Sequence, residues 1–335
     1  MVIGASWVVQ WWFEVPEVVI LLRIFGVLVP VHVLFHLQSA LMQGMQRQWA
    51  FGLIQTLPQQ GFALLALLIF SLWERDIRLP GAAMAVSVCL TGIVAYWVFR
   101  GIWRGMPLGA DTVVGEMSDG ALLGVAWPMF MTASAYLVMN WTDTVMIGLI
   151  HDETEVGLYS VAMRWALFVP LLLSAVNVII TPKMAACYGR GDARGLREVV
   201  QQSARLISIG SLVVALPLVV FPGWFLGWFG GVFTSASTAL IFLVLGTLIN
   251  ALCGPVGSVL NMTGGERSFR NTVVLATGIN LILNLILVPR YGIEGAAFAS
   301  MIAVGLYNIL GVFQVKRRLG FYPLWIPFQG ASSWR

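Results

Sequence analysis

Two charged side chains interrupt apolar stretches near the middle of the chain. Asp143 lies in one stretch and Arg164 lies in the next. If both stretches are helical, these residues lie roughly 9 Å and roughly 12 Å from the same end, at about 1.5 Å per residue. Matching depth on neighbouring antiparallel helices predicts a structural ion pair, because an unpaired charge in an apolar environment is costly. The alternative is a proton- or substrate-responsive site, and the two hypotheses are compatible.

A third charged candidate, Arg23, lies in an apolar stretch near the start of the chain that contains no acid. One hypothesis is that Arg23 extends to the nearer interface or pairs with Glu17 just outside the stretch. The other is that it contacts a phosphate group, because the planar donors of a guanidinium group match phosphate oxygens.

Amide and imidazole side chains recur at helical spacing. Asn280 and Asn284 are four residues apart and share a helix face, as do His32 and His36. The asparagines predict either interhelical hydrogen bonds or contacts to hydroxyl groups of a ligand such as a sugar. Two histidines at this spacing can hold a metal. No third ligand is evident, so we predict helix packing and no metal site.

Motifs for enzymatic chemistry do not emerge from the sequence. The segment "GGER" at 264–267 lacks the Lys-Ser/Thr that a phosphate-binding loop requires. The three cysteines, Cys89, Cys187 and Cys253, form no CxxC pair. We therefore predict a protein that is not an enzyme and that uses no cofactor.

Composition predicts the environment of these side chains. The 335 residues are 59% hydrophobic and only 10% charged, whereas soluble domains carry about 25% charged residues. Apolar stretches of roughly 20 residues, enough to cross a bilayer as a helix, recur along the chain. They are continuous rather than alternating, which favours helices over a barrel. The predicted fold class is an all-α polytopic membrane protein.

Nine membrane-spanning helices are predicted after a short stub at 1–13. Their ranges are 18–42, 50–72, 81–99, 120–149, 156–181, 199–221, 237–262, 271–288 and 294–314. Prolines within them (Pro128, Pro170, Pro217 and Pro255) predict kinks.

The Lys and Arg residues predict the orientation. If the "KRRLG" segment after the last span is cytoplasmic, alternation places 14 of the 19 Lys and Arg residues on the same side. The acidic segment "HDETE" at 151–155 then lies outside. The polar piece at 183–206 is predicted to be an amphipathic helix or helical hairpin at the cytoplasmic surface. The net charge of +4 is thus a topology signal, and we expect no nucleic-acid partner.

Internal similarity suggests two lobes. "QGMQR" at 43–47 resembles "TGGER" at 263–267, and "GAAMA" at 81–85 resembles "GAAFA" at 295–299. Both copies run the same way through the membrane, as in the parallel repeats of two-lobed transporters.

The lobes define four predicted regions. These are an incomplete N-terminal lobe of a stub and three spans (1–99), a cytoplasmic linker (100–119), a six-helix C-terminal lobe (120–314) and a cytoplasmic tail (315–335). Three spans against six lead us to expect two further helices encoded upstream.

Several segments carry a resemblance to a known family. "DTVMIG" and "EVGLYSVAMR", then "TPKMAACYGRGD" and "NLILNLILVPRYGIEGAAFAS", resemble the second lobe of bacterial polysaccharide (O-antigen type) flippases. That family belongs to the superfamily of multidrug, oligosaccharidyl-lipid and polysaccharide exporters. The resemblance implies two pseudo-symmetric helical bundles around a central cavity, the first bundle incomplete here, and alternating access.

The resemblance also implies a function and partners. We expect a transporter in the bacterial cytoplasmic (inner) membrane that flips polyprenyl-pyrophosphate-linked oligosaccharide for lipopolysaccharide or other surface polysaccharide, coupled to H⁺ or Na⁺. Membrane lipids are the other expected partners. Its candidate substrate-binding residues are Arg23, Asp143, Arg164, Asn280 and Asn284.

Other functions remain as alternatives. A multidrug or cation antiporter of the same superfamily needs several acids in its cavity, and the spans contain only Asp143 apart from Glu294 at the first position of the last span. An integral-membrane enzyme of polysaccharide assembly needs a large extramembrane loop or an acidic catalytic set. A scaffold for envelope assembly needs no transport path.

Overall fold

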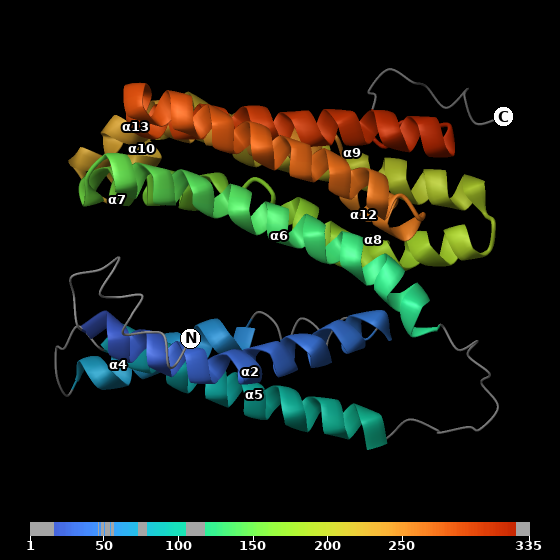
Figure 1. Cartoon of the computed structure of the whole chain (residues 1–335), viewed down its shortest axis with the longest axis horizontal. Helices are drawn as coiled ribbons and strands as arrows, with labels where there is room; N and C mark the ends of the chain where they lie inside the picture. Colours follow the sequence, from blue (N-terminus) through green and yellow to red (C-terminus); the bar gives the residue numbers. More distant parts are fainter. Residues whose placement is uncertain are drawn as a thin grey trace. The chain divides into compact units, whose positions relative to one another are not determined.

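The computed structural model describes residues 17–45, 47, 50, 54, 57–72, 79–104 and 118–325. Every regular element within these residues is a helix (Figure 1), which confirms the predicted all-α class. The chain divides into two compact units, Met1–Val114 and Gly115–Arg335. The division falls inside the predicted linker, most of which, like the stub at 1–13, lies outside the described residues.

Three helices make up the described part of unit 1. They are α2 (Glu17–Gly44), α4 (Leu57–Ser71) and α5 (Leu79–Arg104). The first and third confirm the predicted spans 18–42 and 81–99. α4 is shorter than the predicted span 50–72, of which only Ala50 and Ile54 are described before Leu57. Both α2 and α5 pack side chains into one core, which contains Phe35, Met42, Val88 and Ala95.

Unit 2 contains the remaining helices. In chain order they are α6 (Asp119–Ile150), α7 (Glu153–Ala166), α8 (Leu171–Gly189), α9 (Ala193–Val220), α10 (Pro222–Gly227), the 3₁₀ helix η1 (Gly231–Ala236), α11 (Ser237–Leu252), α12 (Val256–Met262) and α13 (Glu266–Leu319).

Prolines divide two of the predicted spans. α7 ends at Ala166 and α8 begins after Pro170, while α11 ends at Leu252 and α12 begins after Pro255. A proline lacks the N–H that a continuous helix requires and clashes with the preceding turn. The predicted single spans 156–181 and 237–262 are therefore each two helices. The other two prolines lie inside α6 and α9 without ending them.

α13 is a helical hairpin. Its backbone leaves the helical conformation at Gly292, with φ 52° and ψ −132°, values that glycine adopts far more readily than any other residue. The arms lie side by side (Figure 1) and are joined by a hydrogen bond from Gln314 Nε2 to Thr272 Oγ1 of 2.6 Å. They correspond to the predicted spans 271–288 and 294–314.

The predicted surface piece at 183–206 is not a separate element. α8 continues to Gly189 and α9 begins at Ala193, so two long helices meet at a tight turn. Asp192 caps α9, because its Oδ1 accepts from the backbone N–H of Gly195 at 2.8 Å. The segment is thus a helical hairpin, as one of the two predicted forms has it, but it consists of the ends of α8 and α9 rather than of a separate surface piece.

The helices have the length and apolar surface of a multi-pass membrane protein. Within the part of the chain that the structure describes, seven helices are long and apolar enough to cross a bilayer. The nine predicted spans exceed this number because α4 is shorter than such a helix and α13 counts once for its two arms. Leu, Val, Ile and aromatic side chains are exposed along the helices, as expected for surfaces that face lipid.

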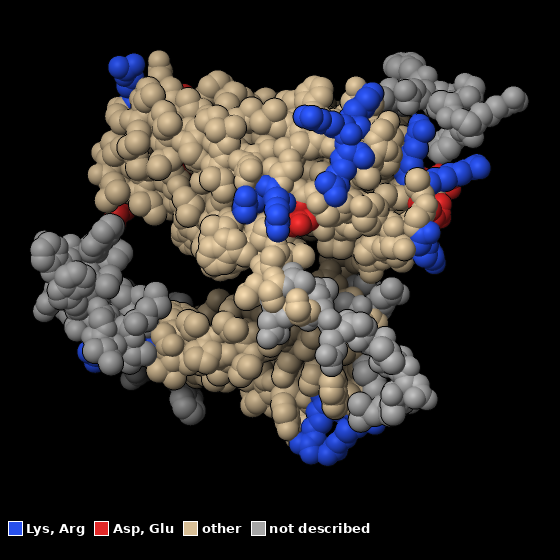
Figure 2. Space-filling model, turned by 45° about the vertical axis from the view of Figure 1, so that its right-hand side comes forward, with Lys and Arg blue, Asp and Glu red and all other residues tan. Residues whose placement is uncertain are grey.

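The two ends of unit 2 differ in chemistry. Its Lys and Arg side chains gather mainly toward one end (Figure 2), where α8 meets α9 and where α13 begins and ends. At the other end, α10 and η1 contain no Lys or Arg, and Trp224, Trp228 and Phe229 are exposed. Exposed aromatic rings of this kind favour the membrane–water interface.

Candidate functional site

The carboxylate of Asp143 is the centre of a buried polar cluster. Asp143 lies in α6 and is only 1% exposed. Tyr159 Oη donates to its Oδ2 at 2.6 Å, Ser300 Oγ donates to the same oxygen, and Asn284 Nδ2 donates to its Oδ1 at 2.8 Å. Three neutral donors therefore compensate one acid.

Separate helices supply these donors. Tyr159 is on the buried face of α7, Asn284 is on the first arm of α13 and Ser300 is on the second. Asn280, one turn before Asn284, donates to Ser300 Oγ at 3.3 Å. The α13 hairpin thus presents both arms to one point on α6, and the cluster holds three elements together. These are the interhelical hydrogen bonds that the asparagine spacing predicts as one alternative.

Two oxygens of the cluster have no hydrogen-bond partner within the part of the chain that the structure describes. The Oδ1 atoms of Asn280 and Asn284 are buried and unpaired, and both residues are 0% exposed. A carboxylate and two amide oxygens are hard acceptors, the type of ligand that alkali and alkaline-earth cations bind. The cluster can therefore accept a proton at Asp143 or hold a small cation.

A cavity of about 330 Å³ adjoins the cluster. Asp143, Tyr159 and Ser300 contribute polar atoms to its wall, and the rest of the lining is mostly apolar side chains of α6, α7, α11 and α13. A volume of this size is at the lower end of the roughly 300–1,000 Å³ of small-molecule sites. The acid is therefore buried but lies at the edge of a space that a ligand can enter.

The predicted ion pair between Asp143 and Arg164 is wrong. Among the described residues, Asp143 bonds to neutral groups only, and no ion pair reaches Arg164. Arg164 is exposed. It follows Tyr159 by five positions, so it points roughly 140° away around α7 at about 100° per residue. Equal depth along two helices does not bring side chains together when one of them faces outward.

Arg23 is exposed on α2. The side chain of Glu17, its alternative partner, lies outside the described residues. The phosphate contact therefore stays a prediction. Unit 1 contains no equivalent of the Asp143 cluster among its described residues.

The acidic segment at 151–155 has a structural role. Asp152 caps α7, and its Oδ1 accepts from the backbone N–H of Glu155 at 3.0 Å. Glu153 and Glu155 lie in the first turn, where negative charge interacts favourably with the helix dipole. His151 joins the segment to the α13 hairpin, because its Nε2 donates to the carbonyl oxygen of Val288 at 2.9 Å.

The two histidines of α2 contact each other. Their Nε2 atoms are 3.1 Å apart, and both rings pack against Phe35. These contacts fit the predicted packing role.

Sequence reasoning missed Tyr159 and Ser300 as members of the site. Both lie inside quoted motifs, "GLYSVA" and "GAAFAS". A periodicity argument could have found Tyr159, because it shares the buried face of α7 with Ala162 and Ala166. Nothing local distinguishes Ser300 from other serines in apolar helices.

Comparison with known proteins identifies the family. Residues 1–186, more than half of the chain, match the family model described as polysaccharide biosynthesis protein. The chain belongs to this family. Residues 128–286 also match the model of the MatE family, so this part of the chain is similar to multidrug-and-toxin-extrusion (MATE) proteins.

Two similar proteins are named as probable flippases. The chain is 26% identical over 229 residues to the probable low-salt glycan biosynthesis flippase Agl15 of Haloferax volcanii, covering 61% of this chain and 48% of that protein. It is 27% identical over 188 residues to the probable flippase AglR of the same organism, covering 55% and 39%. The chain thus spans about half or less of the length of these relatives.

Solved structures share the fold. A MATE protein in its bent conformation superposes with a TM-score of 0.76 at 15% identity, covering 96% of this chain and 73% of that one. A transporter of the multidrug/oligosaccharidyl-lipid/polysaccharide (MOP) superfamily from Pyrococcus furiosus gives 0.74 at 14% identity, covering 96% and 74%. Together with the family match, this likeness confirms the predicted MOP-superfamily membership.

Proposed function

We propose that this polysaccharide biosynthesis protein acts in flipping polyprenyl-pyrophosphate-linked oligosaccharide across the cytoplasmic membrane of a bacterium. Two helical bundles around a central cavity would alternate in access, with the C-terminus in the cytoplasm. The observation that carries the proposal is the family match, together with relatives named as probable flippases.

The Asp143 cluster is the proposed coupling site. A flippase without a nucleotide-binding loop draws on an ion gradient, and Asp143 is a buried acid at the edge of a cavity. Binding of H⁺ or Na⁺ would change the charge shared by α6, α7 and both arms of α13. The unpaired Oδ1 atoms of Asn280 and Asn284 support an ion held by oxygen ligands, so these residues act on the ion rather than on the substrate.

Arg23 and Arg164 are the proposed substrate contacts. Both are exposed, and Arg164 has no carboxylate partner among the described residues. An arginine that is free of an acid can bind pyrophosphate oxygens with two parallel hydrogen bonds.

Surface polysaccharide in a deletion strain tests the proposal. A strain that lacks its own flippase should regain surface polysaccharide when supplied with the gene for this protein, and lipid-linked intermediate should stop accumulating inside. Arg23→Gln should reduce export severalfold with an unchanged melting temperature, because the side chain is exposed. Arg47→Gln is the control, because Arg47 is also exposed and lies beyond the end of α2 at Gly44. A strain whose export does not respond to the gene contradicts the proposal.

A multidrug antiporter is the second candidate. The MatE match and two relatives named as probable multidrug resistance protein NorM favour it. The same strains exposed to cationic dyes separate the candidates. Protection of the cells from dyes without restored surface polysaccharide would favour drug export over flipping as the function.

A further inference from the structure

Unit 2 contains a second cavity, separate from the one beside Asp143. It has a volume of about 380 Å³ and lies between α6, α8, the break from α11 to α12, and both arms of α13. None of its lining residues belongs to the Asp143 cluster. The proposed coupling mechanism leaves this space unexplained.

The break between α11 and α12 opens this space. α11 stops at Leu252 and α12 begins at Val256, and the backbone at Gly254 adopts φ +76°, which glycine tolerates without strain. Gly254, Pro255 and Val256 all line the cavity. The interruption therefore leaves room inside the bundle where a straight helix would fill it.

Neutral amides dominate the polar part of the wall. Asn177, Asn250, Asn261 and Asn308 come from four different helical segments, and none of the described residues that line the cavity is charged. The Oδ1 atoms of Asn177 and Asn261 are buried and have no hydrogen-bond partner among the described residues. Buried polar atoms are nearly always paired in folded proteins. Both residues are half-buried, so their amide groups point to a ligand that exchanges hydrogen bonds with amides.

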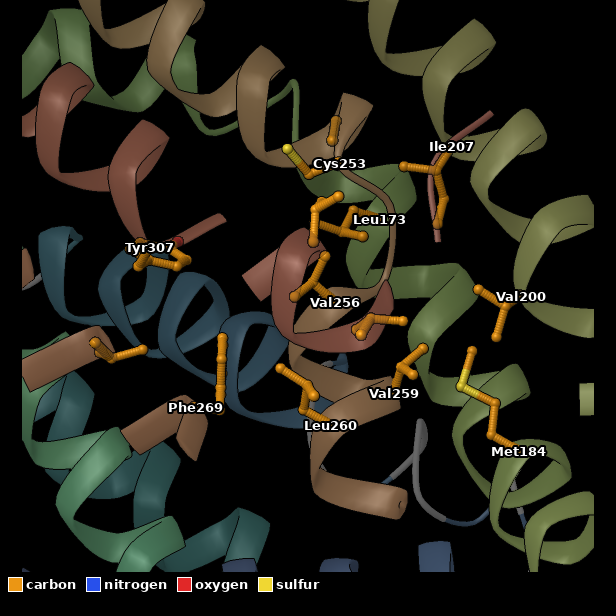
Figure 3. Packing of buried hydrophobic residues seen from close by; sticks show 14 of the residues in the cluster. Leu173, Met184, Val200, Ile207, Cys253, Val256, Val259, Leu260, Phe269 and Tyr307 are labelled. Atoms are coloured by element: carbon orange, nitrogen blue, oxygen red, sulfur yellow. The ribbon is translucent and has the colours of Figure 1, made fainter. Parts of the chain in front are cut away.

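Aromatic rings form another part of the wall. Tyr136 of α6 and Tyr307 of the second α13 arm meet edge to face with centroids 5.3 Å apart, and Phe269 lies 6.4 Å from Tyr307. Figure 3 shows Tyr307, Phe269 and Val256 within the cluster of buried hydrophobic residues of unit 2. The cavity thus combines apolar ring surfaces with amides, which suits a ring-shaped ligand that has C–H groups on its faces and hydroxyl groups at its edge.

The charge pattern separates this ligand class from two others. A phosphate group needs Lys, Arg or several N–H donors, whereas the lining here has no cation. A metal cation would leave an uncompensated charge inside the bundle, because no carboxylate lines the cavity, and unpaired charge at membrane depth is costly. A neutral polyhydroxylated ligand has neither problem.

We infer that the cavity beside the α11–α12 break is a binding subsite for a neutral sugar ring. The inference rests on the proposed function, in which such a ring belongs to the lipid-linked oligosaccharide. The amide groups of Asn177 and Asn261 form hydrogen bonds with the sugar hydroxyls, and the rings of Tyr136 and Tyr307 pack against the sugar. The pyrophosphate end of the same substrate would bind elsewhere, at exposed arginines.

Saturation-transfer NMR on the full chain in nanodiscs tests the subsite. The probes are the methyl glycosides of glucose, galactose, mannose, rhamnose and N-acetylglucosamine. We expect a saturable signal from at least one of them, weakened about tenfold or more in Asn177→Leu/Asn261→Leu, since two lost hydrogen bonds have about this effect. Asn271→Leu is the matched control, because Asn271 is exposed and does not line the cavity.

Each outcome decides the inference. No saturable signal with any of these glycosides overturns it, as does equal binding by the double variant and the control. Melting temperatures show whether the double variant folds. If it does not, Tyr136→Leu takes its place, because it removes the ring that packs against the sugar, and unchanged glycoside affinity in that variant overturns the inference.

The same measurements keep this inference distinct from the proposed function. Glycoside binding without restored surface polysaccharide would support the sugar subsite and contradict the proposed flipping function. Restored surface polysaccharide without glycoside binding would support the proposed flipping function and contradict the sugar subsite.

Discussion

At the scale of single residues, one buried acid organises unit 2. Asp143 is hydrogen-bonded by Tyr159, Asn284 and Ser300, which come from α7 and both arms of α13. The hydroxyls of Tyr159 and Ser300 donate to the carboxylate alone among the described residues, whereas Asn284 Nδ2 also donates to the carbonyl oxygen of Asn280 at 3.0 Å. A buried donor left without an acceptor is costly in a low-dielectric interior. A change in the charge of Asp143 therefore alters hydrogen bonds to α7 and to both arms of α13 at the same time, and so affects how these helices pack.

This arrangement predicts that Asp143 and Arg164 act independently. Asp143→Ala should destabilise the protein by several kcal/mol, because each buried donor left unpaired costs about 1–3 kcal/mol. Arg164→Ala should change stability by less than about 0.5 kcal/mol, as for other surface substitutions. In the double variant the two effects should add to within about 0.5 kcal/mol. Unfolding free energies measured in mixed micelles provide the comparison.

A second variant measures the contribution of a single hydrogen bond to the Asp143 carboxylate. Tyr159→Phe keeps the carboxylate and the packing but removes one donor, so it should cost about 1 kcal/mol. If the double variant of Asp143 and Arg164 loses clearly less unfolding free energy than the sum of the two single variants, the two residues form an ion pair and the proposed independence of Asp143 and Arg164 is wrong.

At the scale of helices, interruptions position the site. The α13 hairpin brings Asn284 and Ser300 to the same side of α6 because its arms reverse direction at Gly292. The break between α11 and α12 creates the second cavity. Both features depend on backbone conformations with positive φ at glycine. The polar clusters of unit 2 therefore exist because regular helices stop at particular residues.

The hairpin turn predicts a sharp contrast between two glycines of α13. Gly292→Ala should destabilise the protein by about 1–3 kcal/mol, since φ 52° with ψ −132° is strained for any residue with a Cβ. Gly278→Ala should be neutral or stabilise by about 0.5–1 kcal/mol, because Gly278 is helical and a Cβ there meets nothing within 4 Å. Thermal unfolding in detergent measures both. Equal effects would mean that the turn is not a constraint.

The cap of α7 predicts a conservative rescue. Asp152→Ala removes the acceptor for the Glu155 N–H and should destabilise α7 by about 0.5–2 kcal/mol, whereas Asp152→Asn retains an acceptor and should stay within a few tenths. Melting temperatures of the three proteins test this. If the asparagine variant is as unstable as the alanine variant, the cap is not the reason for the acidic segment.

At the scale of the whole molecule, membrane insertion depends on the difference between helix ends. Unit 2 gathers most of its Lys and Arg side chains toward one end (Figure 2) and exposes Trp224, Trp228 and Phe229 at the other. Lys and Arg are retained on the cytoplasmic side of membranes. The α8–α9 turn should therefore lie in the cytoplasm and the α6–α7 turn outside.

Cysteine labelling tests this orientation. In a variant without Cys89, Cys187 and Cys253, an impermeant maleimide added to intact cells should label Glu153→Cys and leave Arg194→Cys unlabelled. Both positions are exposed, so access from one side of the membrane decides the result. Labelling of both after permeabilisation is the control. The reverse pattern would invert the topology.

The sequence alone determined the class, most of the helices and the end-to-end charge pattern. These depend on composition and on residues close in sequence, because about 20 apolar residues suffice to predict a span. It also singled out Asp143, Asn280 and Asn284, since polar side chains are rare in apolar stretches.

Only the tertiary structure decided which of these residues meet. Depth along a helix follows from counting residues, but the direction in which a side chain points around the axis depends on how the helices pack. Arg164 matches Asp143 in depth and faces outward, whereas Ser300, 157 residues away along the chain, donates to the carboxylate. Which residue pairs with the buried acid depends on how each helix is rotated about its own axis and on the turn in α13. The spacing of charges along the sequence predicts neither.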